Sequence, residues 1–237
     1  MKDDADMPIS VIIPALNEEA CLAETLRSLR AEQPREIIVV DGGSSDATCE
    51  LAQRRTDSVS CRVSLLHGPR GRAAQMNQGA AHATGDVLLF LHADCTLEAG
   101  ALRAAEECLG RGGVAGGCFR MMVTAGGPAY RLLDACATAR VRLTGLIYGD
   151  QGLFVERRLF ERMGGFPPLL LMEDLYFSRM LRGEGRIVVA PRRIFASPRR
   201  WQRQGFLRQT LRNWTLTALA AAGVPPDCLT VHYPMVR

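Results

Sequence analysis

The segment Glu36–Thr48 most constrains the fold of this chain. Its Ile37–Val40 portion is an unbroken β-branched run, typical of a strand buried on both faces of a parallel sheet. The run ends at a carboxylate, Asp41. Two glycines then permit a sharp turn, and residues 44–46 are favourable N-cap types for a helix. The sequence therefore predicts that Asp41 lies at the carboxyl end of a buried strand, where open α/β sheets bind ligands.

A second apolar run, Ile9–Ile13, also leads into a polar loop. We expect Pro14 to end this strand and Asn17 to cap the helix that follows. Because neighbouring parallel strands end at the same edge of a sheet, Asn17, Glu18 and Asp41 are expected to lie together there.

Strands and helices alternate through the first half of the chain. The hydrophobic pattern predicts strands at 9–13, 36–40, 62–66 and 86–91, and helices at 18–31, 46–55, 72–83 and 98–109. This alternation predicts an α/β fold with a mostly parallel central sheet and flanking helices. Beyond residue 110 we expect strands at 117–123 and 187–190, and helices at 128–143, after Glu173 and at 201–222.

Length and composition favour a single domain in the cytoplasm. The 237 residues, 47% of them hydrophobic, suffice for one substantial core. We find no apolar run long enough to span a membrane and no apolar region typical of a secretory signal at the acidic amino terminus. The eight cysteines include no C-x-x-C pair, so the sequence suggests neither a zinc site nor a disulfide framework.

Positive charge is concentrated near the carboxyl end. No Asp or Glu occurs from Gly185 to Pro226, a stretch rich in arginine. Such a block could meet substrate phosphates or the anionic inner face of a membrane. We expect no nucleic-acid partner, because the sequence has no RNA-binding aromatic pattern. A solubilising face is the alternative, which a one-sign block of this length makes less favoured.

The first two strand ends together resemble a known family. S-V-I-I-P-A-L-N-E-E, followed about 25 residues later by I-I-V-V-D-G-G-S-S-D-A-T, resembles the opening of the family 2 inverting glycosyltransferases, which have the GT-A fold. In that family the first loop and the Asp that ends the second strand hold the nucleoside of a nucleotide-sugar. The resemblance implies donor contacts at Pro14, Ala15, Asn17, Glu18, Asp41 and Gly43.

A third strand end carries the segment L-H-A-D, Leu91–Asp94. It stands in the place of the family's D-x-D motif, whose carboxylates bind a divalent cation. The resemblance implies that Asp94 is the ligand of Mg or Mn and that His92 and Ala93 contact the donor. His92 replaces the first Asp of the motif, so it could contact ribose or phosphate, coordinate manganese, or be a hydrogen-bonded structural residue.

Two further segments extend the resemblance. The helix that opens at Gly71 begins with Arg72, and helix amino termini favour anions. The resemblance implies that Arg72 contacts the diphosphate or uracil, although an arginine in solvent is an equally good interpretation. G-G-F-P followed by Glu173 and Asp174 resembles the acceptor-side motif of the family. It implies that Asp174 is the general base and that Glu173 orients it or the acceptor, whereas paired acids at a helix start are also ordinary.

Two loops complete the candidate site. Glycines flank Asp150 and Gln151, which could hydrogen-bond donor-sugar hydroxyls or the acceptor, or simply belong to a polar turn. S-P-R-R-W, residues 197–201, resembles the Q-x-x-R-W motif of processive members, with Ser in place of Gln. It implies that Arg200 holds the diphosphate and that Trp201 stacks on a sugar or base.

The resemblance covers most of residues 8–201 and is closest to small soluble radical-SAM/selenodomain-associated transferases. It implies an inverting hexosyl- or N-acetylhexosaminyl-transferase with a UDP-linked donor, a divalent metal and an unidentified acceptor. We expect a nucleotide-binding half at 8–110, an acceptor-binding half at 111–200 and a C-terminal helix and tail at 201–237. The sequence leaves open whether the chain forms a homodimer. The alternatives are a non-catalytic sugar-nucleotide-binding protein and, less favoured, a nucleotidyltransferase.

Overall fold

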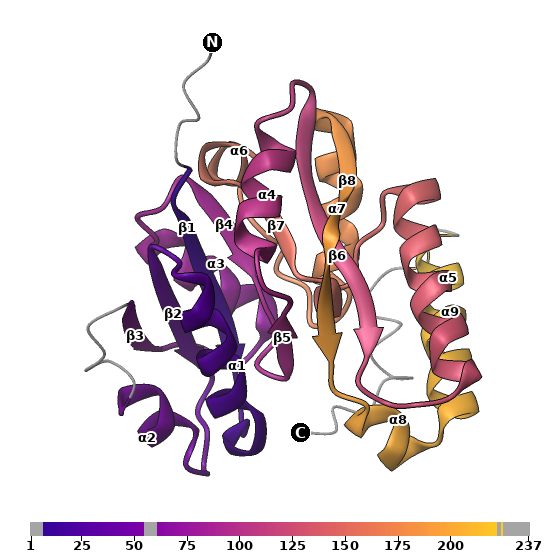
Figure 1. Cartoon of the computed structure of the whole chain (residues 1–237), viewed down its shortest axis with the longest axis horizontal. Coiled ribbons are helices and arrows are strands. Elements are labelled where there is room, and N and C mark those ends of the chain that lie inside the picture. The colour runs from indigo at the N-terminus through magenta and orange to yellow at the C-terminus, as the bar shows by residue number, and fades with distance from the viewer. Residues whose placement is uncertain (1–6, 55–60, 222–223, 225–237) are drawn as a thin grey trace.

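The computed structural model describes residues 7–54, 61–221 and 224. A mixed sheet crosses the molecule (Figure 1), in the order β3-β2-β1-β4-β7-β6-β8-β5. Its strands are β1 (Ile9–Ala15), β2 (Glu36–Asp41), β3 (Arg62–His67), β4 (Val87–Phe90), β5 (Cys95–Leu97), β6 (Val114–Val123), β7 (Leu153–Glu156) and β8 (Arg186–Ala196).

Helices flank this sheet on both faces. They are α1 (Glu19–Glu32), α2 (Thr48–Gln53), α3 (Arg72–His82), α4 (Ala101–Leu109), α5 (Pro128–Thr144), α6 (Arg157–Arg162), α7 (Glu173–Glu184), α8 (Arg199–Gln204) and α9 (Phe206–Ala221), with a 3₁₀ turn, η1 (Gly149–Gln151). Alternate residues of β1 and β2 enter two different hydrophobic clusters. One cluster includes α1 and α4, and the other includes α3, α6 and α7. The predicted α/β fold is therefore confirmed.

The pairing of the strands divides the sheet into two parts. Strands β3, β2, β1 and β4 are parallel, as the alternation predicted. β7 then pairs antiparallel with both β4 and β6, β6 pairs parallel with β8, and β8 pairs antiparallel with β5. Because β1 and β2 are neighbours, with Ala15 opposite Asp41, their loops meet at one edge of the sheet.

Several predicted boundaries were wrong. Pro14 does not end its strand but lies within β1, where β4 has already stopped pairing and only β2 continues alongside. Asn17 does not cap α1, because Glu18 is the N-cap residue. The strand expected at 187–190 is the longer β8. The helix expected at 201–222 is divided into α8 and α9 at Gly205, whose φ is 83°.

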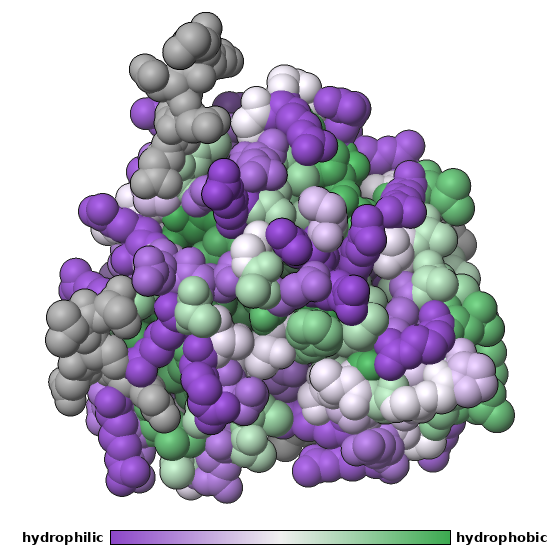
Figure 2. All heavy atoms as spheres, viewed as in Figure 1, coloured by the Kyte–Doolittle hydropathy of each residue, from purple (hydrophilic) through white to green (hydrophobic). Residues whose placement is uncertain are grey.

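The edge of the molecule formed by α5 and α9 exposes large apolar side chains. Hydrophobic atoms gather along this edge, on the right of Figure 2. Its exposed side chains are Leu132, Leu143, Leu207, Leu211 and Trp214. Within the described part of the chain, no helix combines the length and the apolar character needed to cross a membrane.

Candidate functional site

The loops after β1 and β2 are held together by hydrogen bonds. The Asn17 backbone N–H donates to Ser44 Oγ at 2.9 Å, and the Ser45 N–H donates to Asn17 Oδ1 at 2.9 Å. Asn17 has a φ of 54°, which is uncommon for a residue other than glycine. The side chain of Asn17 therefore fixes the meeting of the two loops rather than the start of α1.

Asp41 lies at this edge and is 2% exposed. One carboxylate oxygen accepts the Gly43 N–H at 2.9 Å, and both oxygens accept the Ser44 N–H, at 3.1 and 3.2 Å. Burial opposes ionisation, but these hydrogen bonds outweigh it and hold the pKa of Asp41 below its usual value. Asp41 is thus a charged acceptor at the edge where ligand contacts were predicted.

Asp41 also belongs to a cluster that the cysteine spacing did not indicate. Donor atoms of Asp41, Cys49 and His67 lie within 4.8 Å of one another, in a geometry that could hold a metal ion. Burial, together with the hydrogen bond to Asp41, raises the pKa of the Cys49 thiol. A cation bound here would have to displace the thiol proton, because the thiolate is the form that ligates metal.

Four other predicted donor contacts lie nearby. Pro14 and Ala15 are buried in β1, and the Ala15 carbonyl accepts the Gln75 side chain at 2.8 Å. Gly43 has a φ of 92° in the turn after β2, where a side chain would be strained. The Ala93 carbonyl accepts the hydroxyl of a threonine on α1 at 2.7 Å. These residues shape the strand-end loops through their backbone.

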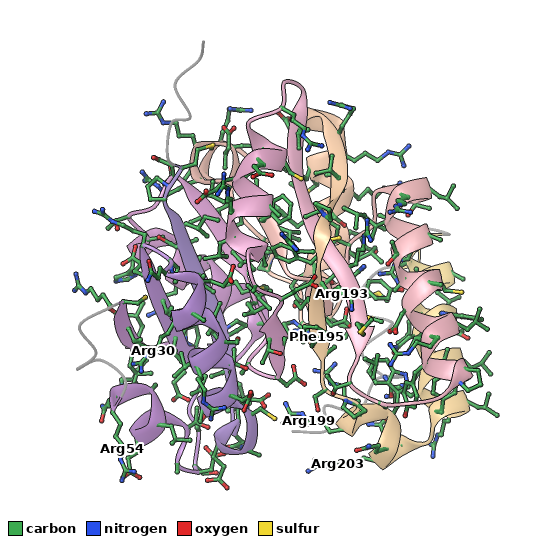
Figure 3. All side chains as sticks on the ribbon, viewed as in Figure 1. Arg30, Arg54, Arg193, Phe195, Arg199 and Arg203 are labelled. Carbon is green, nitrogen blue, oxygen red and sulfur yellow. The ribbon has the colours of Figure 1, made fainter. Side chains whose placement is uncertain are left out.

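Glu18 and Asp94 share one arginine, Arg199 at the start of α8 (Figure 3). Arg199 Nη2 lies 3.1 Å from Asp94 Oδ2 and also pairs with Glu18. Burial opposes the charge of Arg199, but the two carboxylates outweigh it and raise its pKa. The sequence interpretation included Arg199 only as part of the arginine-rich block. The one signal for it was its place in S-P-R-R-W, directly before Arg200.

A small pocket of about 80 Å³ brings several predicted site residues together. It is lined on one side by α3 and the end of β4, and on the other by η1, α7, α8 and α9. The sequence-predicted residues in its wall are Arg72, His92, Asp150, Asp174 and Arg200. Tyr148, Met172 and Asn213 also line it, and sequence reasoning did not single them out.

Asp174, one of the two carboxylates that line this pocket, is 9% exposed. Its Oδ1 accepts the Leu175 N–H at 2.7 Å, and its Oδ2 accepts the N–H of Gly149. A Cβ at Gly149 would overlap the His92 ring nitrogen Nε2 and lie 3.0 Å from Asp174 Oδ2. Only glycine therefore allows these three residues to approach so closely.

Glu173, the neighbour of Asp174, is 1% exposed and pairs with Arg72. Arg72 Nε lies 2.7 Å from Glu173 Oε1, and Arg72 Nη2 donates to Oε2 at 3.3 Å. Burial raises the pKa of Glu173 above its usual value, although Arg72 opposes the shift. The pair joins α3, in the first half of the chain, to α7.

Asp150 lies between this pocket and a second, larger cavity of about 420 Å³. Burial raises the pKa of Asp150, opposed by Arg140 and Arg200. Trp201, predicted to stack on a sugar or base, is 6% exposed and lines the larger cavity rather than the pocket that holds Asp174.

Comparison with known proteins identifies the family of the chain. The family model described as glycosyl transferase family 2 matches residues 10–134, more than half of the chain. Glycosyltransferase AglE of Haloferax volcanii is 27% identical over 188 residues, which cover 75% of this chain and 62% of that protein. An undecaprenyl-phosphate 4-deoxy-4-formamido-L-arabinose transferase of Pseudomonas paraeruginosa is 37% identical over 93 residues, covering 36% of this chain and 27% of the relative.

Solved structures of glycosyltransferases share the fold of this chain. Mannosyltransferase PcManGT from Pyrobaculum calidifontis, in complex with GDP-Man and Mn2+, superposes with a TM-score of 0.66 and 25% identity, covering 80% of this chain and 56% of that one. S. aureus TarS 1-349, in complex with UDP-GlcNAc, has a TM-score of 0.64 and 21% identity, covering 81% and 58%. This chain thus spans less than two thirds of the length of each of these proteins. The family model, which covers more than half of the chain, shows that the chain belongs to glycosyl transferase family 2.

Proposed function

We propose that this chain is an inverting glycosyltransferase that moves a sugar from a UDP-linked donor to an acceptor hydroxyl. The observation that carries the proposal is the orientation of Asp174, whose two carboxylate oxygens are fixed by backbone N–H groups in a pocket with His92 and Arg200. A carboxylate held in this way is suited to act as a general base. The similar structures that hold GDP-Man and UDP-GlcNAc support a nucleotide-sugar donor.

The proposed reaction is a single displacement. Asp174 removes the proton of the acceptor hydroxyl while that oxygen attacks the anomeric carbon of the sugar. The new carbon–oxygen bond forms as the bond to the diphosphate breaks, and the electron pair leaves with the diphosphate. Attack opposite the leaving group inverts the anomeric centre, with no covalent sugar–enzyme intermediate.

The donor would lie along the strand-end loops of residues 8–110. Asp41 offers a charged acceptor to hydroxyl or amide groups of the nucleoside. Arg200 lies in the wall of the pocket and supplies positive charge for the diphosphate. Arg72 is paired with Glu173, so its first role is to position α7, and residues 111–200 supply the acceptor side.

A divalent cation fits Asp94. The carboxylate is a hard ligand suited to Mg or Mn, and in this structure it already attracts a positive group, the Arg199 guanidinium. The metal, when bound, would offset the charge that develops on the leaving diphosphate. His92 Nε2 lies against Gly149, whose N–H binds Asp174 Oδ2, so we assign His92 to the acceptor side and Asp94 to the metal.

We also propose a peripheral contact with an anionic membrane. Leu207, Leu211 and Trp214 recur at helical spacing on one face of α9 and are exposed, and exposed Arg203 and Arg208 lie beside them in the chain. Co-sedimentation with anionic but not neutral vesicles, lost at high salt, is the expected result. A concentration-dependent dimer without vesicle binding would assign this edge to self-association instead.

The function is tested in two steps. The first is a thermal-shift panel of UDP, GDP, CMP and dTDP, each with EDTA, Mg or Mn, in which UDP with metal should raise the melting temperature. The second is transfer or hydrolysis of UDP-sugars by Asp174→Asn and by a control on the same helix, Glu184→Gln. Asp174→Asn should keep the UDP shift and lose about 10²–10⁴-fold of turnover, as expected for loss of a general base.

Two outcomes would overturn the proposal. Full turnover by Asp174→Asn would remove the assigned base. A UDP shift with no turnover of any UDP-sugar by the native chain, tested with a broad set of acceptors, would favour the non-catalytic sugar-nucleotide-binding alternative.

A further inference from the structure

The larger cavity lies beside the Asp174 pocket, between α5, η1 and α9. Its walls are mainly apolar, with Met121, Leu133, Ala137 and Trp214 among them. Its volume of about 420 Å³ is within the range of small-molecule sites, about 300–1,000 Å³. The donor loops that carry Asp41 take no part in it, so a ligand in this cavity would be distinct from the nucleotide.

Three buried polar atoms of this cavity have no hydrogen-bond partner within the described part of the chain. They are Asp150 Oδ1, Trp201 Nε1 and Thr210 Oγ1. Trp201 is 6% exposed, so solvent does not satisfy its N–H. A buried polar atom without a hydrogen-bond partner lowers the stability of the fold, and such atoms are rare in native proteins. A carboxylate oxygen, an indole N–H and a hydroxyl together would pair with a ligand that both donates and accepts hydrogen bonds.

The cavity adjoins the pocket of the proposed base and shares three wall residues with it. Tyr148, Asp150 and Asn213 line both spaces. Tyr148 is held in place, because its ring stacks under the Arg140 guanidinium at 3.4 Å and its hydroxyl bonds to Thr217 on α9. The shared wall is therefore pre-organised, and a ligand could occupy the cavity with one end beside Asp174.

From these observations we infer that the cavity binds the acceptor, and that the acceptor is an amphiphile with an apolar chain and a hydroxyl-bearing head. The apolar chain would fill the space between α5 and α9. The head group would pair with Asp150, Trp201 and Thr210 and present one hydroxyl to Asp174. This inference rests on the proposed function for the role of Asp174, whereas binding in the cavity is testable without turnover.

The probe is n-octyl β-glucoside below its micellar concentration, which joins an eight-carbon chain to a hydroxyl-rich head. Methyl β-glucoside, with the same head, is the control ligand. The two tryptophans of the chain, Trp201 and Trp214, both line the cavity, so their fluorescence reports its occupancy. We expect a saturable change with octyl glucoside and none with methyl glucoside.

Two variants locate the binding. Ala218→Phe places a large side chain in the wall of the cavity from α9 and should weaken octyl glucoside binding about tenfold or more, an effect of at least 1.4 kcal/mol. Ala31→Phe, at an exposed position of α1, is the matched control and should bind as the native chain does. Thr210→Val removes an unpaired hydroxyl, so it should keep or raise the melting temperature while weakening binding about fivefold.

The outcomes separate this inference from the proposed function. No saturable signal in the native chain, or equal binding by Ala218→Phe and the native chain, overturns the acceptor cavity. If UDP still raises the melting temperature in that case, the glycosyltransferase proposal is untouched. Octyl glucoside binding without any UDP shift would keep the cavity as an amphiphile site and remove its assignment to an acceptor.

Discussion

Arg199 Nη2 lies 3.1 Å from Asp94 Oδ2, and the same guanidinium pairs with Glu18. This arginine therefore joins α8, near the end of the described chain, to the loops after β1 and β4. Its guanidinium pairs with Asp94, the carboxylate that we propose as the metal ligand. A metal ion and the guanidinium would therefore compete for Asp94.

Replacing Arg199 by alanine should have two opposite effects. Buried Glu18 and partly buried Asp94 lose their shared cation, so the free energy of unfolding in urea should fall by about 1–3 kcal/mol, less than for a fully buried pair because the Arg199 side chain is 27% exposed. Without the competing guanidinium, Mn²⁺ should bind about tenfold more tightly in the absence of nucleotide, measured by the loss of free Mn²⁺ signal in electron paramagnetic resonance. Arg203→Ala, on the same helix, is the control. Unchanged Mn²⁺ affinity in Arg199→Ala would show that Asp94 is not the ligand.

Local patterns predicted much of the donor edge. The apolar runs before Ala15, Asp41 and Asp94 end in polar loops, and a parallel sheet brings neighbouring strand ends together, so the meeting of the Asn17 and Asp41 loops followed from the sequence. The later elements were harder to predict. β5 and β7 are too short to show a period, and β7 is placed by pairing with β4 and β6 rather than by its own composition.

The partners of the site residues could not be predicted in the same way. Arg72 and Glu173 are separated by 101 positions, and Arg199 and Glu18 by 181, so no local pattern indicates either pair. Arg72 was predicted to contact the diphosphate or uracil, not Glu173, and Arg199 was one of many arginines in the basic block. Which arginine meets which carboxylate is decided by where α7 and α8 pack, and that is a tertiary property.

The Arg72–Glu173 pair gives a second prediction. Arg72→Ala leaves the Glu173 carboxylate buried without its cation, which should lower the free energy of unfolding by about 3–5 kcal/mol unless the carboxyl takes up a proton. Adding Glu173→Gln removes the charge as well, so the double variant should be more stable than Arg72→Ala alone. A double-mutant cycle from urea unfolding at pH 7 measures this coupling. Additive effects of the two changes would mean that the pair contributes nothing as a pair.

Glu36 provides a test of pH dependence away from the pocket. Burial opposes its ionisation, but the Thr84 N–H at 2.7 Å and the Ser10 hydroxyl at 2.8 Å outweigh burial and lower the pKa of Glu36. Because the folded-state pKa is the lower one, this carboxylate stabilises the fold above the unfolded-state value of about 4.5. That contribution is lost as the pH falls through the folded-state pKa.

Glu36→Gln should therefore be less stable than the native chain at pH 7, and the difference should shrink as the pH is lowered below about 4.5. Urea unfolding at pH 7, 5, 4 and 3.5 measures the difference. Glu107→Gln, an exposed residue of α4, should follow the native curve throughout. A Glu36→Gln difference that grows toward low pH would contradict the assigned direction.

Gly149 gives the sharpest test of the proposed active site. A methyl group there would overlap the His92 ring and press on Asp174 Oδ2, so Gly149→Ala should displace the carboxylate that the Gly149 N–H now fixes. We expect a loss of stability of about 1–3 kcal/mol, typical of overpacking, and a loss of turnover of about 10²-fold, because a small misplacement of a catalytic group is costly. Gly126→Ala, where a methyl group would meet nothing within 4 Å, is the matched control.

UDP binding should survive in both variants, since the donor loops lie elsewhere. Adding His92→Ala to Gly149→Ala removes the overlapping ring and should restore the stability of the fold. If His92 also serves the acceptor side, this double variant should not regain full turnover. Native turnover by Gly149→Ala would mean that the reaction does not depend on the present position of Asp174, and the base would have to be sought at another carboxylate of the pocket.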